Sequence, residues 1–131
     1  MSINIIAIVA ATLASTVVGS LWYLMLGKSW RAAVGWTEGG PAYRPSPLEL
    51  GVALIAQLVM AVALSGLLAH MGGASVRSGL ITAVGIWLGF ILPSLATNVT
   101  FQRRDKRLIW QDGLHWLLIL AVQGVMLGLL L

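Results

Sequence analysis

Four long stretches of the sequence carry no charged residue. A helix that crosses a bilayer needs about 20 mostly apolar residues, and each stretch supplies most or all of one. Inside hydrocarbon, backbone N–H and C=O groups must be paired within the protein, which favours helices. The pattern therefore predicts an all-α integral membrane four-helix bundle, a single domain over residues 1–131, with spans at residues 3–26, 47–70, 78–100 and 108–131.

The start of the second span carries a local helix signal. Ser46 precedes Pro47, and Glu49 follows three residues after the serine. This order places a capping side chain, a proline at the first helical position and an acidic residue at the third, which is typical of a helix N-terminus.

Composition supports a membrane protein. Hydrophobic residues make up 59% of the chain and charged residues 9%, whereas a soluble domain has about 25% charged residues. We therefore exclude a soluble enzyme, a disordered segment and a nucleic-acid binder. Because the chain has no cysteine and its two histidines fall on opposite sides of the predicted membrane, we expect no metal site and no cofactor.

Charged residues predict the orientation. Seven of the eight basic residues fall in two loops that lie on one side of the membrane, residues 27–47 and 101–107, and Arg77 falls on the other. The positive-inside rule then places both loops in the cytoplasm and both termini outside. The seven residues are Lys28, Arg31, Arg44, Arg103, Arg104, Lys106 and Arg107.

The first loop begins with a short segment, residues 28–36, that holds Trp30 and Trp36 between basic residues. We expect about two helical turns lying in the headgroup region. The segment serves either as an anchor or as a lid over a headgroup site. Basic side chains of both loops are candidates for binding anionic lipid headgroups: Arg31, Arg103, Arg104 and Arg107.

Small residues recur every four positions in the predicted helices, which permits close packing in a bilayer. The rows are Ala7, Ala11, Ser15 and Gly19; Ala53, Ala61, Ser65 and Ala69, with Gln57 in the gap; Gly85 and Gly89; and Gly124 and Gly128. We interpret them as helix–helix seams, either within one subunit or between subunits. Four short helices enclose little volume, so we expect a homo-oligomer.

Polar residues inside the spans gather near one membrane surface. Tyr23, Asn98, Asp112 and His115 each fall within about 10 Å of the cytoplasmic end of their helices at 1.5 Å per residue. We predict that they form one ligand-binding cluster, which Lys28 or Arg107 caps. Gln57 and Gln123 lie deeper, and Gln123 is a further ligand candidate.

Each of these residues also has a structural interpretation. Asp112 can pair with Lys106 or Arg107, or interact with the helix dipole. His115, Asn98 and the glutamines can join helices by hydrogen bonds. Pro93, which cannot donate to the carbonyl of Gly89, predicts a kink in the third span.

Two motifs resemble a known family. The first combines Gly19-Ser20-Leu21-Trp22-Tyr23 with Gly27-Lys28-Ser29-Trp30; the second combines Trp87-Leu88-Gly89-Phe90 with Pro93-Ser94, Asn98 and Phe101. Together they are similar to the bacterial membrane proteins grouped as domain of unknown function 1761. The resemblance implies four spanning helices, a bacterial cytoplasmic membrane and no established activity. It also includes four residues of interest: Tyr23, Lys28, Trp30 and Asn98.

Three functions remain open. The favoured one is an oligomeric module that binds or passes a small solute through the polar cluster. The second is a small membrane-embedded enzyme or lipid-binding protein that uses Asp112 and His115. The third is a structural accessory subunit, in which the polar groups serve assembly alone. We expect the lipid bilayer as partner and a binding module rather than an enzyme.

Overall fold

A computed structural model of the chain describes residues 4–35 and 45–131. Within these ranges all regular structure is helical, and four stretches are long and apolar enough to cross a membrane, as the sequence predicts. The third stretch combines three elements into one continuous span. The elements are α1 (Ile5–Ala33), α2 (Pro47–His70), α3 (Val76–Ile86), the π-helical turn η1 (Trp87–Ile91), α4 (Leu92–Phe101) and α5 (Arg107–Leu130).

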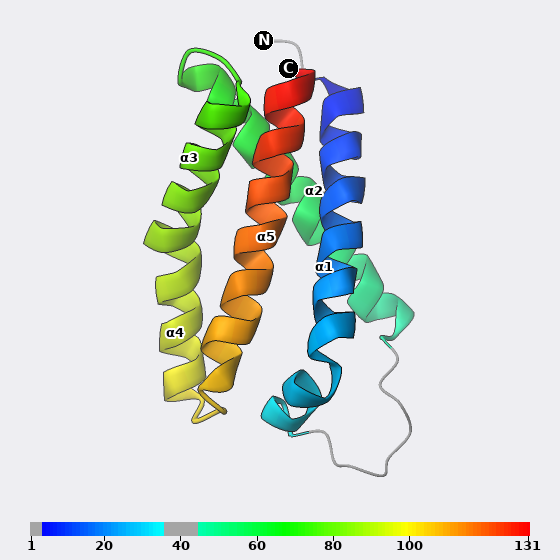
Figure 1. Cartoon of the computed structure of the whole chain (residues 1–131), viewed down its shortest axis with the longest axis vertical. Helices are drawn as coiled ribbons and strands as arrows, with labels where there is room; N and C mark the ends of the chain where they lie inside the picture. The colour runs from blue at the N-terminus through cyan, green and yellow to red at the C-terminus, as the bar shows by residue number, and fades with distance from the viewer. Residues whose placement is uncertain (1–3, 36–44) are drawn as a thin grey trace.

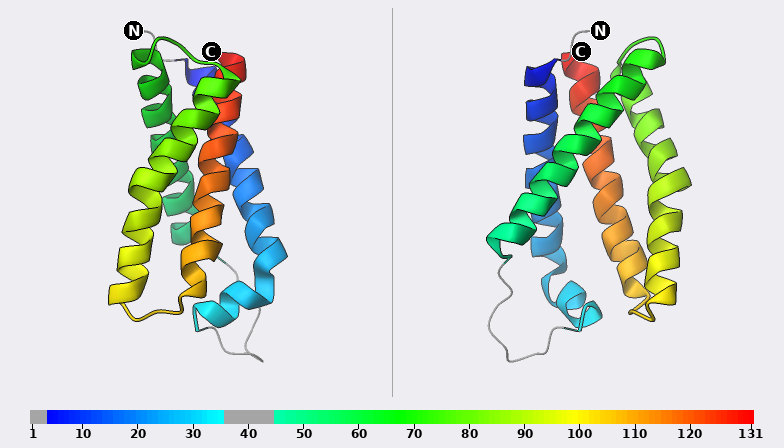
Figure 2. Two further views of the ribbon diagram at one scale, coloured as in Figure 1. Left: turned by 60° about the vertical axis from the view of Figure 1, so that its left-hand side comes forward. Right: turned by 180° about the vertical axis from the view of Figure 1, so that it is seen from behind.

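The C-terminal helix α5 occupies the middle of the molecule. It packs against α1 on one side and against α3, η1 and α4 on the other, while α2 crosses obliquely behind (Figures 1 and 2). Both termini lie at the same end, and the α4–α5 loop lies at the opposite end with the last turns of α1 (Figure 1). Central α5 therefore contributes to most of the helix contacts and carries three of the seven buried polar residues of the described chain, more than any other helix.

Serine hydroxyl groups cap two helices. At the start of α2, Ser46 Oγ accepts the N–H of Glu49 at 3.2 Å, with Pro47 in the first turn. At the start of α3, Ser75 and Ser78 form a reciprocal capping box. These bonds satisfy backbone N–H groups that have no partner inside the helix.

Helix α1 continues beyond its expected end near residue 26 because the chain bends and then resumes helical geometry. The bend lies at Gly27, whose φ of 22° and ψ of −95° are conformations that residues with a Cβ avoid. The Nε of Arg31 donates to the carbonyl of Gly27 at 3.3 Å. The expected interfacial segment is thus helical as far as Ala33 and turns away from the α1 axis (Figure 2). Ile3, Trp36 and Arg44 lie outside the described residues.

Glycines let α5 approach both neighbours closely. A Cβ on Gly79 or on Gly124 would collide with the carbonyl of the other, and a Cβ on Gly128 would collide with the backbone of Ser75. On the other side, Gly19 lies against His115. The α1 row is buried as expected, so its seam lies within the subunit: Ala7, Ala11, Ser15 and Gly19.

Two of the expected seams do not form within the subunit. Gly85 and Gly89 face open space, because nothing lies within 4 Å of a Cβ placed on either. On α2, Ala53 and Ala69 are exposed, and the buried face follows Gln57, Ala61, Leu64 and Leu68 instead. Of the α2 row, Ala61 packs in the core cluster together with the larger side chains of Leu64 and Leu68.

The third span contains one wider turn just before Pro93. The N–H of Leu92 bonds to the carbonyl of Trp87, five residues back, so the turn before the proline is π-helical at the place where the sequence predicts a kink. A π turn holds about one residue more than an α turn, which rotates all later residues by about 100°. Trp87 consequently faces α5, whereas Ser94 and Asn98 are exposed. Trp87 therefore lies on a different face of the span from Ser94 and Asn98.

Candidate functional site

Asp112 is the centre of a polar and aromatic group between α1 and α5. The hydroxyl of Tyr23 donates to Asp112 Oδ1 at 2.6 Å, and Trp30 Nε1 donates to the same oxygen at 3.0 Å. The rings of Tyr23 and Trp30 lie 5.1 Å apart, and the ring of His115 lies 4.6 Å from that of Tyr23. We call these four residues the Asp112 group.

The two donors reach Asp112 from opposite sides of the Gly27 bend. Tyr23 lies on the straight part of α1, and Trp30 lies on the short segment that follows. The bend therefore returns Trp30 to the same carboxylate.

In a straight helix, Tyr23 and Trp30 would lie about 10 Å apart along the axis, at 1.5 Å per residue. The bend at Gly27 removes that separation, so both side chains donate to one oxygen atom.

Within the described part of the chain, hydrogen-bond donors reach only one of the two carboxylate oxygens of Asp112. Oδ1 accepts both hydrogen bonds, while Oδ2 accepts none from residues 4–35 and 45–131 and is not among the atoms sealed from the surface. Among the described residues, no cationic side chain lies within salt-bridge distance of Asp112. Asp112 also lies in the second turn of α5, beyond the first turn where the helix dipole acts. Neither structural interpretation of this residue, an ion pair or a dipole contact, describes its surroundings.

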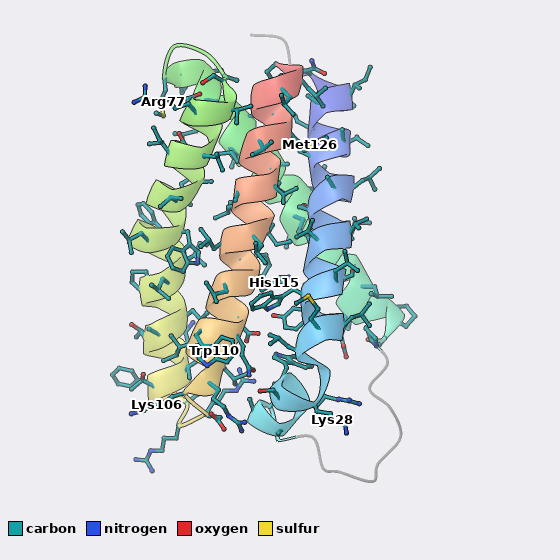
Figure 3. The ribbon with its side chains drawn as sticks, in the orientation of Figure 1. Lys28, Arg77, Lys106, Trp110, His115 and Met126 are labelled. Atoms are coloured by element: carbon teal, nitrogen blue, oxygen red, sulfur yellow. The ribbon has the colours of Figure 1, made fainter. Side chains whose placement is uncertain are left out.

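His115 is enclosed by aromatic rings and by α1. Its side chain points toward α1 (Figure 3), is 7% exposed, and lies 4.7 Å from the ring of Trp116. A Cβ on Gly19 would lie 2.8 Å from His115 Nε2, so the glycine makes room for the imidazole. His115 Nδ1 is buried without a hydrogen-bond partner. Tyr23 contacts both His115 and Asp112, which do not bond to each other.

A second set of hydrogen bonds joins the same two helices beside the Asp112 group. Trp22 Nε1 donates to the carbonyl of Gln111 at 2.9 Å, and Gln111 Nε2 donates to Ser29 Oγ at 2.8 Å. Gln111 Oε1 is buried without a partner. Sequence reasoning missed Gln111, although a glutamine directly before an intramembrane acid is itself a signal.

Three expected members of the cluster lie elsewhere. Asn98 is exposed on α4 and takes no part in the hydrogen bonds of the group. Lys28 is exposed and projects away from α5 (Figure 3). Arg107 pairs instead with Asp105 at 2.8 Å, and this contact holds the pKa of the Asp105 carboxyl below its ordinary value. The predictions that Asn98 joins the cluster and that Lys28 or Arg107 caps it are therefore wrong.

The other three candidates for binding lipid headgroups lie at the same end of the molecule. Arg103 and Arg104 are exposed in the turn after α4, where Arg103 adopts a positive φ of 54°. Arg31 is partly buried against the Gly27 bend. Figure 3 shows Lys28 and Lys106 at this end and Arg77 at the other.

Gln123 belongs to a separate, deeper group. Its Nε2 donates to Ser15 Oγ at 3.1 Å and to the carbonyl of Gln57 at 2.9 Å. Ser15 and Thr16 in turn donate to Gln57 Oε1, at 2.7 and 3.2 Å. We call these four residues the Gln123 group. It is neutral and joins α1, α2 and α5, so it fits the interpretation as interhelical hydrogen bonding.

Comparison with known proteins gives a family and no activity. No curated protein and no solved structure matches the chain. One family does match, over residues 6–128, and its description is "Protein of unknown function (DUF1761)". This match covers nearly the whole chain, in agreement with the resemblance of its two motifs. The chain is therefore a multi-pass membrane protein that belongs to the DUF1761 family.

Proposed function

We propose that this protein binds a small solute at the Asp112 group, on the cytoplasmic side of a bacterial inner membrane. The observation that carries the proposal is the carboxylate of Asp112, which lies within a spanning helix and accepts hydrogen bonds from only two donors of the described chain, both neutral. A charged group at this depth is costly and is a functional candidate by default. The free Oδ2 atom supplies the position where a solute can bind.

Binding is a better description of the site than acid–base catalysis. A general acid or base must reach the proton that it transfers. His115 is nearly sealed, and its free nitrogen has no partner. The imidazole instead supports the ring of Tyr23, which holds the carboxylate.

The distribution of basic residues supports the orientation. Lys28 and Lys106 lie at the end that carries the Asp112 group, and Arg77 lies at the end that carries both termini (Figure 3). The positive-inside rule then places loops 27–47 and 101–107 in the cytoplasm and both termini outside.

A homo-oligomer is part of the proposal. Gly85 and Gly89 form a small-residue row that faces open space, and Asn98 is exposed further along the same span. Small residues and polar side chains are the usual means by which helices associate in lipid. Native mass spectrometry of protein released from nanodiscs will give the number of subunits, and a monomer would contradict this part of the proposal.

The binding test uses the tryptophan beside the carboxylate. Full-length protein in phosphatidylglycerol nanodiscs is titrated with choline, ethanolamine, inorganic phosphate and glucose while tryptophan fluorescence is recorded. We expect at least one saturable response, weakened by roughly tenfold or more in Asp112→Asn, because a hydrogen bond or ion pair to the charge is lost. Asp105→Asn, an acid at the same end that is already paired, is the matched control. Equal saturable responses in wild type and Asp112→Asn would overturn the proposal.

A further inference from the structure

We infer that the solute of the Asp112 group carries an ammonium group, an inference that rests on the proposed function. The first argument is charge. Oδ2 of Asp112 is an anionic oxygen without a cationic partner among the described residues. Removing such a charge from water is unfavourable unless an opposite charge pairs with it. A cation therefore fits this position, and a phosphate or a sulfate does not.

Three basic residues at this end of the described chain do not supply that cation. Arg31 donates to the carbonyl of Gly27, and Arg107 pairs with Asp105. Lys28 projects away from α5 (Figure 3). The counter-ion of Asp112 must therefore come from outside these three side chains.

Aromatic rings around the carboxylate favour an organic cation over a metal ion. Four rings follow one another beside Asp112, with centroids 5.1, 4.6 and 4.7 Å apart: Trp30, Tyr23, His115 and Trp116. Aromatic faces attract ammonium groups, more strongly where water is excluded. Hard metal ions instead prefer six or more oxygen ligands. Over the described residues, no three His, Cys, Asp or Glu side chains gather to supply such a set.

Two sources can provide an ammonium group at this depth. One is a small amine in the cytoplasm, and the other is the headgroup of phosphatidylethanolamine in the inner leaflet. Asp112 is the sixth residue of α5, which begins at Arg107. It therefore lies close to the end of the span, and it is partly exposed. Either source can therefore approach Oδ2, and the chemistry of recognition is the same for both.

The test has one arm for each source. In phosphatidylglycerol nanodiscs, tryptophan fluorescence is titrated with choline, with ethanolamine and with the neutral carbon analogue of choline, in which a tert-butyl group replaces trimethylammonium. In nanodiscs of mixed phosphatidylethanolamine and phosphatidylglycerol, native mass spectrometry records which lipid stays bound. Each arm compares wild type with Asp112→Asn and Asp105→Asn.

A response to choline or ethanolamine, at least about tenfold weaker for the neutral analogue and for Asp112→Asn, would establish a soluble amine. Retention of phosphatidylethanolamine over phosphatidylglycerol, lost in Asp112→Asn, would establish the headgroup. Equal binding of the neutral analogue by the wild type would overturn the inference without relying on any variant. An Asp112-dependent response to phosphate or glucose alone would overturn the inference and leave the proposed function standing. No response to any probe, with no retained lipid, would overturn both.

Discussion

Along its C-terminal half, helix α5 packs with its backbone directly against the backbone of α3. Along its N-terminal half, side chains fill the space between α5 and α1. Gly124 and Gly128 bring α5 against α3 so closely that neither position accepts a Cβ. At the other end, rings and hydrogen bonds from Tyr23 and Trp30 surround Asp112. The C-terminal half is closed and neutral. The N-terminal half holds the charge of Asp112, whose Oδ2 atom accepts no hydrogen bond from the described residues. The contrast separates residues that hold the bundle together from residues that are available to a solute.

The largest expected loss of stability comes from a substitution in the C-terminal half of α5. Gly124→Val places a branched side chain against the carbonyl of Gly79, and backbone cannot move aside as a flexible side chain can. We expect a loss of about 2 kcal/mol or more in the free energy of unfolding. Thermal unfolding in nanodiscs measures it. Gly66→Val, on a helix position with nothing within 4 Å, is the control. Equal stability of the two variants would show that the α3–α5 contact is looser than described.

A smaller effect is expected from the Gln123 group. Gln123→Leu removes the donors to Ser15 and to the carbonyl of Gln57. Interhelical hydrogen bonds in membranes contribute about 0.6 kcal/mol on average and about 1.7 at most, so the loss of stability should fall in that range. The fluorescence response to solute should stay unchanged, because this group lies apart from Asp112. Gln102→Leu, at an exposed glutamine, is the control. Loss of the response would mean that the two groups act together.

The smallest effect concerns the ion pair outside the membrane. The folded pKa of Asp105 is below its ordinary value of 3.8 because Arg107 bonds to the carboxylate. A lowered folded pKa stabilises the protein above the unfolded pKa, and this stabilisation is lost as the pH falls through the folded pKa. The difference in Tm between wild type and Asp105→Asn should therefore be small at neutral pH and vanish in acid. High salt should reduce it further. A difference that persists in acid would point to another role for Asp105.

The spans were predictable because the bilayer leaves the backbone few alternatives. Uncharged length alone located the four helices, and depth along the spans brought Tyr23, Asp112 and His115 to one end. Errors arose where the helix departs from 100° per residue. The π turn rotated Asn98 outward, and the Gly27 bend returned Trp30 inward. Neither departure changes hydropathy, so a pattern of apolar residues does not reveal it.

The sequence also did not predict which small-residue positions would pack against each other. Gly79 and Gly124 pack together, while Gly85 and Gly89 face open space. All four are glycines in apolar surroundings, and spacing gives each the same capacity for close approach. Only the directions of the helices decide which of them meet.

The bend at Gly27 has a consequence for sequence variation. Its backbone angles suit glycine and disfavour every residue that has a Cβ. Position 27 should therefore tolerate almost no replacement, even though its own surroundings are open: the nearest atom to a Cβ placed there is 3.9 Å away, on Arg31. The harm from a replacement would be felt at Asp112, far along the chain, through the displacement of Trp30. Although Gly27 has no side chain, we expect its position to vary as little as that of Asp112, whose carboxylate it helps to hold.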